Sequence, residues 1–577
     1  MNRETQAHFA QIPSMDISRS KFDRSFIHKT TCNTGELVPI YVDPDIIPGD
    51  TVTMKVADLI RMTTPIVPVM DELKADFYFF FVPNRLTMAN WKKLMGENDT
   101  APWIQTTDYV VPQLLIENES DYLTKLTNTV IKGSVLDHMG IPTQYKWKKK
   151  GVDDEPKRSL SISALPARSY AMIWNEFFRS EALQNPVYVP TDDTTVKTLN
   201  ANALQYITDP TAGQTSFAYR GGLPCLPVCK TFDYFTACLP RPQAGPDVTL
   251  PMNGTAPIKT STFEGTYLGQ TYTYGTYSND LYASQQTFGT SQIGDDVQIS
   301  DSTTWGLADS ANGKLYADLS QATGATINQL RTAFAIQKWQ EREARGGQRY
   351  TEMIRSHYNT INPDFRLQRP EYLGGFTHQI SMNQVLSQGN DSSGAPIGTT
   401  GAYSLTTNKN GDVFSHSFTE FGCLIGLMCI RQNQHTYQQG INRAWLKKER
   451  FDWYSPEFAN LGEEYVKEVE IYATGIADDD NAAFGYQERW AEMRYMPDLV
   501  SGEMRSDYTT SLDIWHYADN YTEAPELGDK WIQETKSNVN RSLAVQNQDQ
   551  FKVDLYFGAI YTRPMPVYSV PGLLDHH

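Results

Sequence analysis

Short apolar runs dominate the hydrophobic pattern of the chain. Residues 75–82, ADFYFFFV, are aromatic and end at the turn signal Pro83-Asn84, which is typical of a strand. The continuous apolar run at residues 422–430 suits a strand that is covered on both faces. Residues 469–472 and 551–557 alternate apolar and polar side chains instead, as a strand with one solvent-exposed face does. The pattern predicts a mainly β protein.

Two segments have helical spacing. In residues 166–183, apolar side chains recur at intervals of three and four, which places them on one stripe of a helix. Residues 327–345 carry a second apolar stripe, and Gly346-Gly347 supplies a stop signal. Strands near both ends and isolated helices in the connections do not follow a βαβ rhythm. They predict an antiparallel β-sandwich with long loop insertions and a few helices.

One stretch differs from the rest in its polarity. Residues 252–326 contain only two Lys and seven Asp or Glu, and Thr, Ser, Gly and Tyr dominate. We expect this stretch to form an inserted surface lobe, because surface insertions are well tolerated. The sandwich core would then comprise residues 1–251 and 327–577, with an extended N-terminal arm.

Composition and charge exclude several classes of protein. Of 577 residues, 40% are hydrophobic and 20% are charged, which is a globular composition. The net charge of −17 cannot recruit nucleic acid by the overall field, although local basic patches can. No apolar run is long enough for a transmembrane helix, and residues 1–20 have no signal-peptide core. Six cysteines are too few for a disulfide framework, so we expect reduced thiols. Because no apolar run has transmembrane length, we also expect no membrane insertion.

The sequence contains only weak candidates for catalytic or metal-binding residues. Cys225, Cys229 and Cys238 could hold a metal, but no histidine is nearby in sequence, and packing as small apolar residues is the simpler hypothesis. The triplet 478–480, DDD, is either a calcium ligand set or an exposed acidic turn. The chain has no phosphate-binding glycine loop, no HExxH and no GxSxG. We therefore expect no enzyme activity, no cofactor and no bound metal.

A basic and aromatic stretch at residues 349–369 is the best candidate for a nucleic-acid contact. Its cations and rings alternate, and single strands bind such surfaces through base stacking and phosphate contacts. The same residue types also favour packing between subunits, so both interpretations stay open. The candidate nucleic-acid contacts are Arg349, Tyr350, Arg355, Tyr358, Arg366 and Arg369.

Motifs along nearly the whole chain, in one order, resemble the major capsid protein of gokushoviruses. These viruses are small single-stranded-DNA phages of the Microviridae. The matching motifs are 79–86 (FFFVPNRL), 164–168 (ALPAR), 345–352 (RGGQRYTE), 367–375 (LQRPEYLGG), 437–440 (YQQG) and 484–489 (FGYQER).

The resemblance implies a fold, a function and a set of partners. The fold would be a viral jelly-roll β-sandwich, and the chain would assemble as a homo-oligomer into a T=1 icosahedral shell around circular single-stranded DNA. The partners would be a small basic DNA-binding protein, an internal scaffolding protein and a host cell-surface receptor. The protein would be assembled in the bacterial host cytoplasm and end in the virion.

The resemblance also implies that an insertion protrudes at the threefold axes and meets the host. The polar stretch 252–326 is the candidate, because tyrosine offers a large amphipathic contact surface. The candidate host-attachment residues are Tyr267, Tyr272, Tyr274, Tyr277 and Tyr282. The alternative hypothesis is a carbohydrate-binding or carbohydrate-active β-sandwich protein that uses this lobe as its sugar platform.

Overall fold

The protein is described from a computed structural model, in which the chain divides into two compact units. One unit comprises residues 1–244 and 341–577, and the other comprises residues 245–340, so the predicted lobe lies within the second. The structure describes residues 18–97, 108–117, 130–143, 159–193, 196–198, 207–209, 214–216, 223–246, 248, 258–260, 263–267, 270–274, 315–317, 327–347, 349–388 and 398–568.

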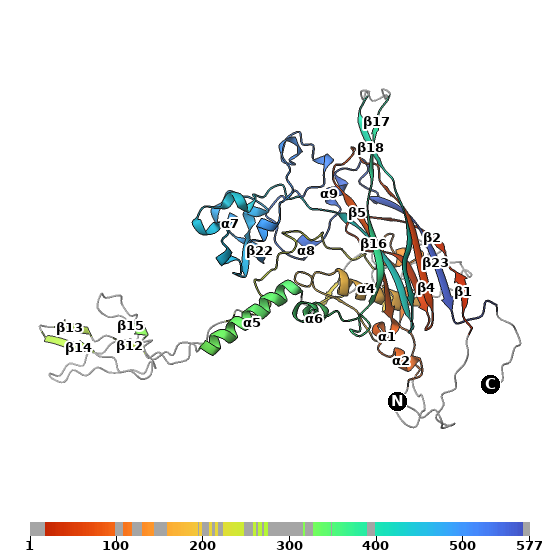
Figure 1. The fold of residues 1–577 in the computed structure, drawn as a ribbon, viewed down its shortest axis with the longest axis horizontal. Helices are drawn as coiled ribbons and strands as arrows, with labels where there is room; N and C mark the ends of the chain where they lie inside the picture. Colours follow the sequence, from red (N-terminus) through yellow and green to blue (C-terminus); the bar gives the residue numbers. More distant parts are fainter. Residues whose placement is uncertain are drawn as a thin grey trace, which may run out of the picture. The chain divides into compact units, whose positions relative to one another are not determined.

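The first sheet of the larger unit brings together strands from opposite ends of the sequence. Its strand order is β1-β23-β4-β19, and β2 also pairs with β23. All of these pairings are antiparallel (Figure 1). The strands are β1 (Ser20–Asp23), β2 (Phe26–Cys32), β4 (Thr51–Met62), β19 (Thr406–Ser417) and β23 (Phe551–Arg563).

The second sheet has the strand order β16-β5-β20-β3 and is also antiparallel. Its central strand β20 is buried along nearly its whole length, as its unbroken apolar run predicted. The strands are β3 (Val38–Ile46), β5 (Leu73–Pro83), β16 (Glu371–Gln379) and β20 (Gly422–Gln432).

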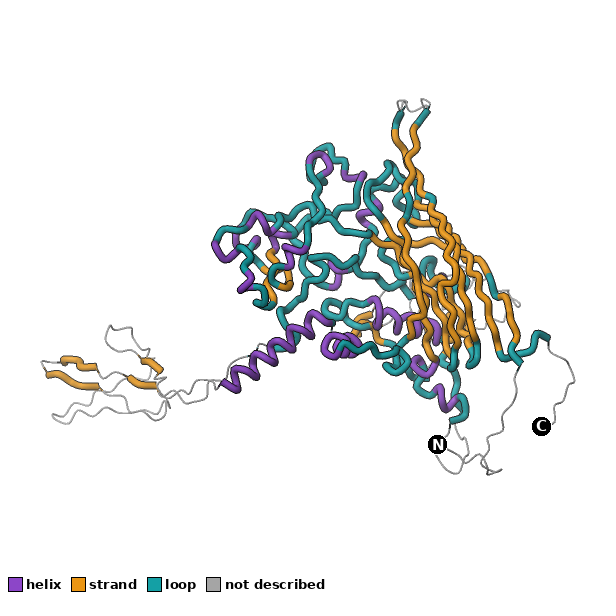
Figure 2. The backbone as a smooth tube through the Cα atoms, in the orientation of Figure 1, coloured by secondary structure: helices purple, strands orange, loops and turns teal. Residues whose placement is uncertain are grey.

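The two sheets pack face to face around the main core. Alternate side chains of β5, including Phe77 and Phe79, meet Phe557 and its neighbours on β23 in one buried cluster. The opposite face of β5, with Phe80, packs against Tyr170 of the helix α4 (Leu165–Ile173). The antiparallel β-sandwich predicted from the sequence is confirmed (Figure 2), and the jelly-roll strand order stays a prediction.

The predicted helix at residues 166–183 is shorter than expected. It runs through α4 into one π-helical turn, η2 (Trp174–Phe178), and Arg179 is already extended. The Asn175 side chain donates to the carbonyl of Val187 and accepts from its amide. These two bonds hold the end of the helix against β8 (Val187–Tyr188), a strand of two residues. The helix therefore ends at Phe178 and does not continue to residue 183.

The strand predicted at residues 469–472 is wrong. The chain forms a 3-10 turn there, η8 (Glu468–Glu470), just after the hairpin strand β21 (Glu463–Lys467). Glu470 is buried, pairs with Arg443 at 3.3 Å and accepts a hydrogen bond from Tyr234. The free energy gained by pairing this buried carboxylate outweighs the strand preference that the alternating pattern indicates.

The remaining elements lie in the connections and in the second unit. The predicted helix at residues 327–345 is confirmed as α5 (Ile327–Gly346). No helix of the described residues is long and apolar enough to cross a bilayer. The other helices are α1 (Asn84–Thr87), α2 (Trp91–Leu94), α3 (Val135–His138), α6 (Tyr350–Tyr358), α7 (Ala477–Asp480), α8 (Asp529–Ile532) and α9 (Ser537–Asn540). The other strands are β6 (Gln113–Glu117), β7 (Ser159–Ser163), β9 (Val196–Thr198), β10 (Ile207–Asp209), β11 (Gln214–Ser216), β12 (Ile258–Thr260), β13 (Phe263–Tyr267), β14 (Gln270–Tyr274), β15 (Leu315–Ala317), β17 (Met382–Leu386), β18 (Thr400–Ser404) and β22 (Ala483–Glu488).

Candidate functional site

Two glycines give the predicted nucleic-acid stretch its local shape. Gly347 has a φ of +94°, which ends α5, and a Cβ there would collide with the carboxylate of Glu352. A Cβ at Gly346 would lie 2.5 Å from the side chain of Ser356. The double glycine therefore lets α6 begin at once and pack closely against the end of α5.

Arg349, at the start of α6, is bonded to several neighbouring groups of the protein. Its guanidinium lies 2.5 Å from a carboxylate oxygen of Glu181 and 3.4 Å from one of Glu352. It also donates to the backbone carbonyls of Asn175 and Arg179. This side chain therefore fixes α6 against the turn η2.

Arg369 is held within the protein in the same way. Its guanidinium lies 2.8 Å from Asp364, donates to the hydroxyl of Thr351, and sits 4.9 Å from the centre of the Phe177 ring. The side chain is four-fifths buried. Arg369 thus joins the loop after α6 to the same turn that Arg349 contacts.

The other four predicted contact residues point to solvent. Tyr350 and Tyr358 are 65% and 73% exposed, and both lie on α6. Arg355 on the same helix and Arg366 in the following loop are exposed as well. The structure therefore separates the predicted set into two positioning arginines and four accessible side chains.

A cleft of about 1170 Å³ lies beside α6. Its walls come from η2 and the residues after it, α6, the end of α5, residues 228–239, and the sheet strands β5, β16 and β20. Arg355 reaches its lining, together with Arg179 and the ring of Phe232. The cleft therefore combines cationic and aromatic side chains from segments that are far apart in sequence.

The predicted host-attachment tyrosines fall in the second unit. Tyr267 ends β13, and Tyr272 and Tyr274 lie on β14, which pairs with β13 as an antiparallel hairpin. Tyr277 and Tyr282 lie outside the described residues.

A second basic and aromatic surface lies at residues 443–454, outside the sites predicted from the sequence. Trp445 is 84% exposed, and Phe451 and Trp453 are exposed too. The Lys447 ammonium lies 4.9 Å from the centre of the Trp453 ring. The sequence signal was available, because residues 443–454 read RAWLKKERFDWY, with the same alternation of cations and rings.

Large apolar side chains are also exposed elsewhere on the larger unit. Met496, Leu499 and Ile361 are each more than four-fifths exposed, on loops outside the sandwich. Exposed apolar side chains on loops are candidates for contact with partner proteins. The loops therefore offer contact surfaces, while the sandwich holds them in place.

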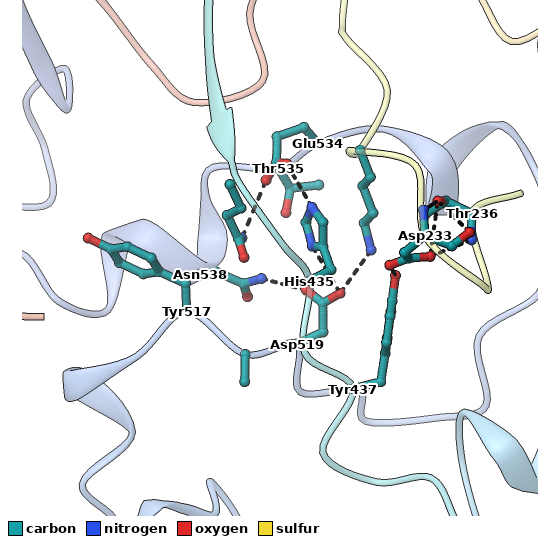
Figure 3. Close-up of polar contacts among 12 residues, drawn as sticks. Asp233, Thr236, His435, Tyr437, Tyr517, Asp519, Glu534, Thr535 and Asn538 are labelled. Atoms are coloured by element: carbon teal, nitrogen blue, oxygen red, sulfur yellow. Dashed lines mark hydrogen bonds and ion pairs between the residues drawn. The ribbon is translucent and has the colours of Figure 1, made fainter. Parts of the chain in front are cut away.

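A buried charged network ties several connecting segments of the larger unit together (Figure 3). Asp519 lies 3.0 Å from the ammonium of Lys230 and 3.5 Å from Nδ1 of His435. Burial raises the pKa of Asp519, but Lys230 and His435 outweigh it and hold the pKa well below its usual range. Asn538 also donates to Asp519. Lys230, His435 and Asp519 are each less than a tenth exposed, so the network stabilises the packing of these segments.

The cysteines considered as metal ligands have other surroundings. The thiol of Cys225 contacts the carbonyl of Gly133, and that of Cys229 contacts Phe178 and Gln184. Burial raises the pKa of Cys229 to about 11. Within the described ranges, no group of three or more His, Cys, Asp or Glu side chains is arranged to hold a metal ion.

Comparisons with known proteins agree along the full length. The family described as capsid protein (F protein) matches residues 10–573. Capsid protein VP1 of Bdellovibrio phage phiMH2K is 38% identical over 99% of this chain and 98% of that protein. Capsid protein VP1 of Spiroplasma virus 4 is 35% identical, and that of Chlamydia phage 1 is 34% identical, each over 98% of this chain and 97% of the relative.

Proposed function

The chain belongs to the phage capsid protein (F protein) family, and from this premise we propose that it forms a closed T=1 icosahedral shell around a circular single-stranded DNA genome. Membership in this family makes the chain a structural capsid protein and not an enzyme. Such a protein self-assembles into the shell of the virion. The family also decides between the two sequence-based hypotheses, against the carbohydrate-binding one.

The observation that supports a closed shell is the exposed apolar surface of the loops. Trp445, Met496 and Leu499 are each more than 80% exposed, whereas the aromatic side chains between the two sheets are fully buried. A well-packed sandwich with apolar loops is what a subunit needs when its neighbours cover those loops. Assembly should therefore be cooperative.

Sizing and negative-stain microscopy of the purified chain test the shell. We expect particles of megadalton mass with icosahedral symmetry, and a Trp445→Ser variant should assemble less completely while its subunits stay folded. Tyr188→Ser removes an exposed ring on the short strand β8 and serves as the comparison. A folded chain that stays monomeric under every ionic condition would contradict the proposal.

The genome contact is proposed for α6 and the loop that follows it. Arg355 and Arg366 would meet phosphates, and Tyr350 and Tyr358 would stack on bases. Arg349 and Arg369 would position this surface, since both have carboxylate partners. Together with a small basic DNA-binding protein and an internal scaffolding protein, this surface would guide packaging in the bacterial host cytoplasm.

Charge reversal separates this genome contact from packing between subunits. Replacing Arg355 and Arg366 by Glu should lower the DNA content of the particles and leave empty shells. Arg61→Glu, an exposed arginine on β4, is the matched control. Unchanged DNA content, or complete loss of assembly, would favour packing between subunits.

The third proposal assigns host attachment to residues 252–326. The support is the low charge of the stretch and its many Tyr, Thr and Ser residues, which suit adhesion to a cell-surface receptor. Replacing residues 254–324 with a short Gly/Ser linker should leave intact shells that no longer adsorb to cells. Normal adsorption would overturn the proposal, and failed assembly would assign the stretch to shell contacts.

A further inference from the structure

The cleft beside α6 holds more positive than negative charge. Its lining includes Arg179, Arg349 and Arg355 together with two carboxylates, those of Glu181 and Glu352. Arg349 pairs with both carboxylates. Among the described residues, neither Arg179 nor Arg355 has a carboxylate within ion-pair distance. The cleft is therefore one negative charge short of balance.

Arg179 is the more buried of the two arginines that lack a carboxylate partner among the described residues. One of its terminal nitrogens donates to the carbonyl of Gln184, at 2.8 Å. Its Nε is buried and has no hydrogen-bond partner among the described residues. Burial and the neighbouring charge of Arg349 lower its pKa, and the carboxylates of Glu181 and Glu176 offset this only in part. A half-buried guanidinium in these surroundings gains free energy from an anion that reaches it.

The remaining cations of the cleft are already neutralised. Arg431 lies 2.8 Å from Asp76 and Lys230 lies 3.0 Å from Asp519, while Arg345 is paired with Glu463. Because each is paired with a carboxylate, these three cations add nothing to the net charge of the cleft. The excess charge therefore belongs to Arg179 and Arg355, which lie on different segments.

Aromatic rings complete the walls. Phe232 is 81% exposed although it lines the cleft, and Tyr372 on β16 is nearly half exposed. Rings that are available to a ligand next to guanidinium groups are the surface on which nucleic-acid bases stack. An acidic peptide would use the cations but would leave these rings uncovered.

We propose that this cleft binds a segment of single-stranded DNA, with a phosphodiester between Arg179 and Arg355 and a base against Phe232 or Tyr372. The proposal rests on the proposed enclosure of single-stranded DNA and adds a site to it. The cleft exceeds the roughly 300–1,000 Å³ of ordinary small-molecule sites, so it has room for a nucleotide with its flanking backbone.

Oligonucleotide binding to the purified full-length chain tests the site. Fluorescence anisotropy with a short labelled oligothymidylate should show at least tenfold weaker binding for the Arg179→Gln/Arg355→Gln double variant. The salt dependence of binding should also become less steep, because fewer phosphates are neutralised. Phe232→Ala should weaken binding by about fivefold or more, as expected for the loss of one stacking contact. Arg61→Gln should bind as the unmodified chain does.

Further measurements keep the outcome interpretable. Because Arg355 is exposed, Arg355→Lys should keep most of the affinity that a Gln at this position loses. Circular dichroism should show that all variants are folded. Binding that is unchanged in the double variant, or that polyglutamate blocks as well as oligothymidylate does, would overturn the site. Particle formation is scored separately by sizing. Loss of oligonucleotide binding in the cleft variants would uphold the site even if no shell formed.

Discussion

Nε2 of His435 lies 2.9 Å from a carboxylate oxygen of Glu534, and each of these side chains is only 1% exposed. Burial lowers the pKa of His435, but the charges of Glu534 and Asp519 outweigh it and raise the pKa to about 9. The ring is therefore a buried imidazolium at neutral pH. It holds the loop after β20 to the segment after α8.

We predict that the stability of the subunit falls in mildly alkaline solution because of this pair. The ordinary pKa of histidine is 6.5 and the folded value is about 9, so the contribution is complete below pH 6.5 and is lost as the pH rises through about 9. The loss is on the order of 3 kcal/mol, at about 1.4 kcal/mol for each pKa unit. Urea unfolding between about pH 6 and pH 10 measures it.

A His435→Gln variant should be less stable by about 3–5 kcal/mol at neutral pH, because it leaves buried carboxylates without their partner. It should also lose the alkaline decline. The matched control is His416→Gln, which breaks a partly exposed pair with Glu371 and should cost less than about 1 kcal/mol. An alkaline decline that persists in His435→Gln would contradict the assignment.

His138 should make the subunit sensitive to acid. Burial lowers the pKa of this histidine from 6.5 to about 4, and its Nδ1 lies 2.9 Å from the hydroxyl of Thr30. Because the folded pKa is the lower one, the contribution is present above pH 6.5 and is lost as the pH falls through about 4. His138→Gln should be less sensitive to mild acid. Thermal unfolding at about pH 7 and about pH 5 would show the difference, and equal sensitivity in both proteins would contradict it.

The hydroxyl of Tyr561 should be worth about 1–3 kcal/mol of stability. It donates to a carboxylate oxygen of Asp43 at 2.7 Å and lies 2.6 Å from the hydroxyl of Tyr41, with all three side chains buried. Tyr561→Phe removes the partner of the Tyr41 hydroxyl and one of the hydrogen bonds to Asp43, which keeps its pair with Arg24. Tyr556→Phe, on the exposed face of the same strand, is the control and should change little. Similar unfolding midpoints for the two variants would show that the bridge contributes nothing.

Gly375 should tolerate no side chain. A Cβ at this position of β16 would lie 2.2 Å from the backbone oxygen of Phe77 on β5. Gly375→Ala must push the paired strands apart, at a cost of about 1–3 kcal/mol or more. At Gly411 on β19 a Cβ would meet nothing within 4 Å, so Gly411→Ala should keep or slightly raise stability. Soluble yield and melting temperature compare the two variants, and equal values would contradict the prediction.

The sequence predicted individual elements better than their connections. The apolar runs that became β5 and β20, and the double glycine after α5, carry their signal locally. The failures have long-range causes. The π turn at the end of α4 depends on Asn175 reaching the backbone of Val187, and the turn at Glu470 depends on Arg443 and Tyr234. No local periodicity reports such contacts.

The candidate site divides in the same way. Alternating cations and rings identified residues 349–369 as a surface for interactions. The pattern could not distinguish Arg349, which Glu181 neutralises, from Arg355, which has no carboxylate partner among the described residues. The cleft could not be predicted from the sequence either, because its walls come from segments that are far apart in the chain.

The pairing of β4 with β23 bears on synthesis of the protein at the ribosome. Ile60 lies opposite Val553, so one edge of β4 stays without its neighbour through almost the whole of translation. Because such distant pairings form slowly and late, the sandwich can close only once the polypeptide has reached β23. Prematurely terminated products would thus lack a finished sheet, and the geometry of the strands would itself keep them out of new particles.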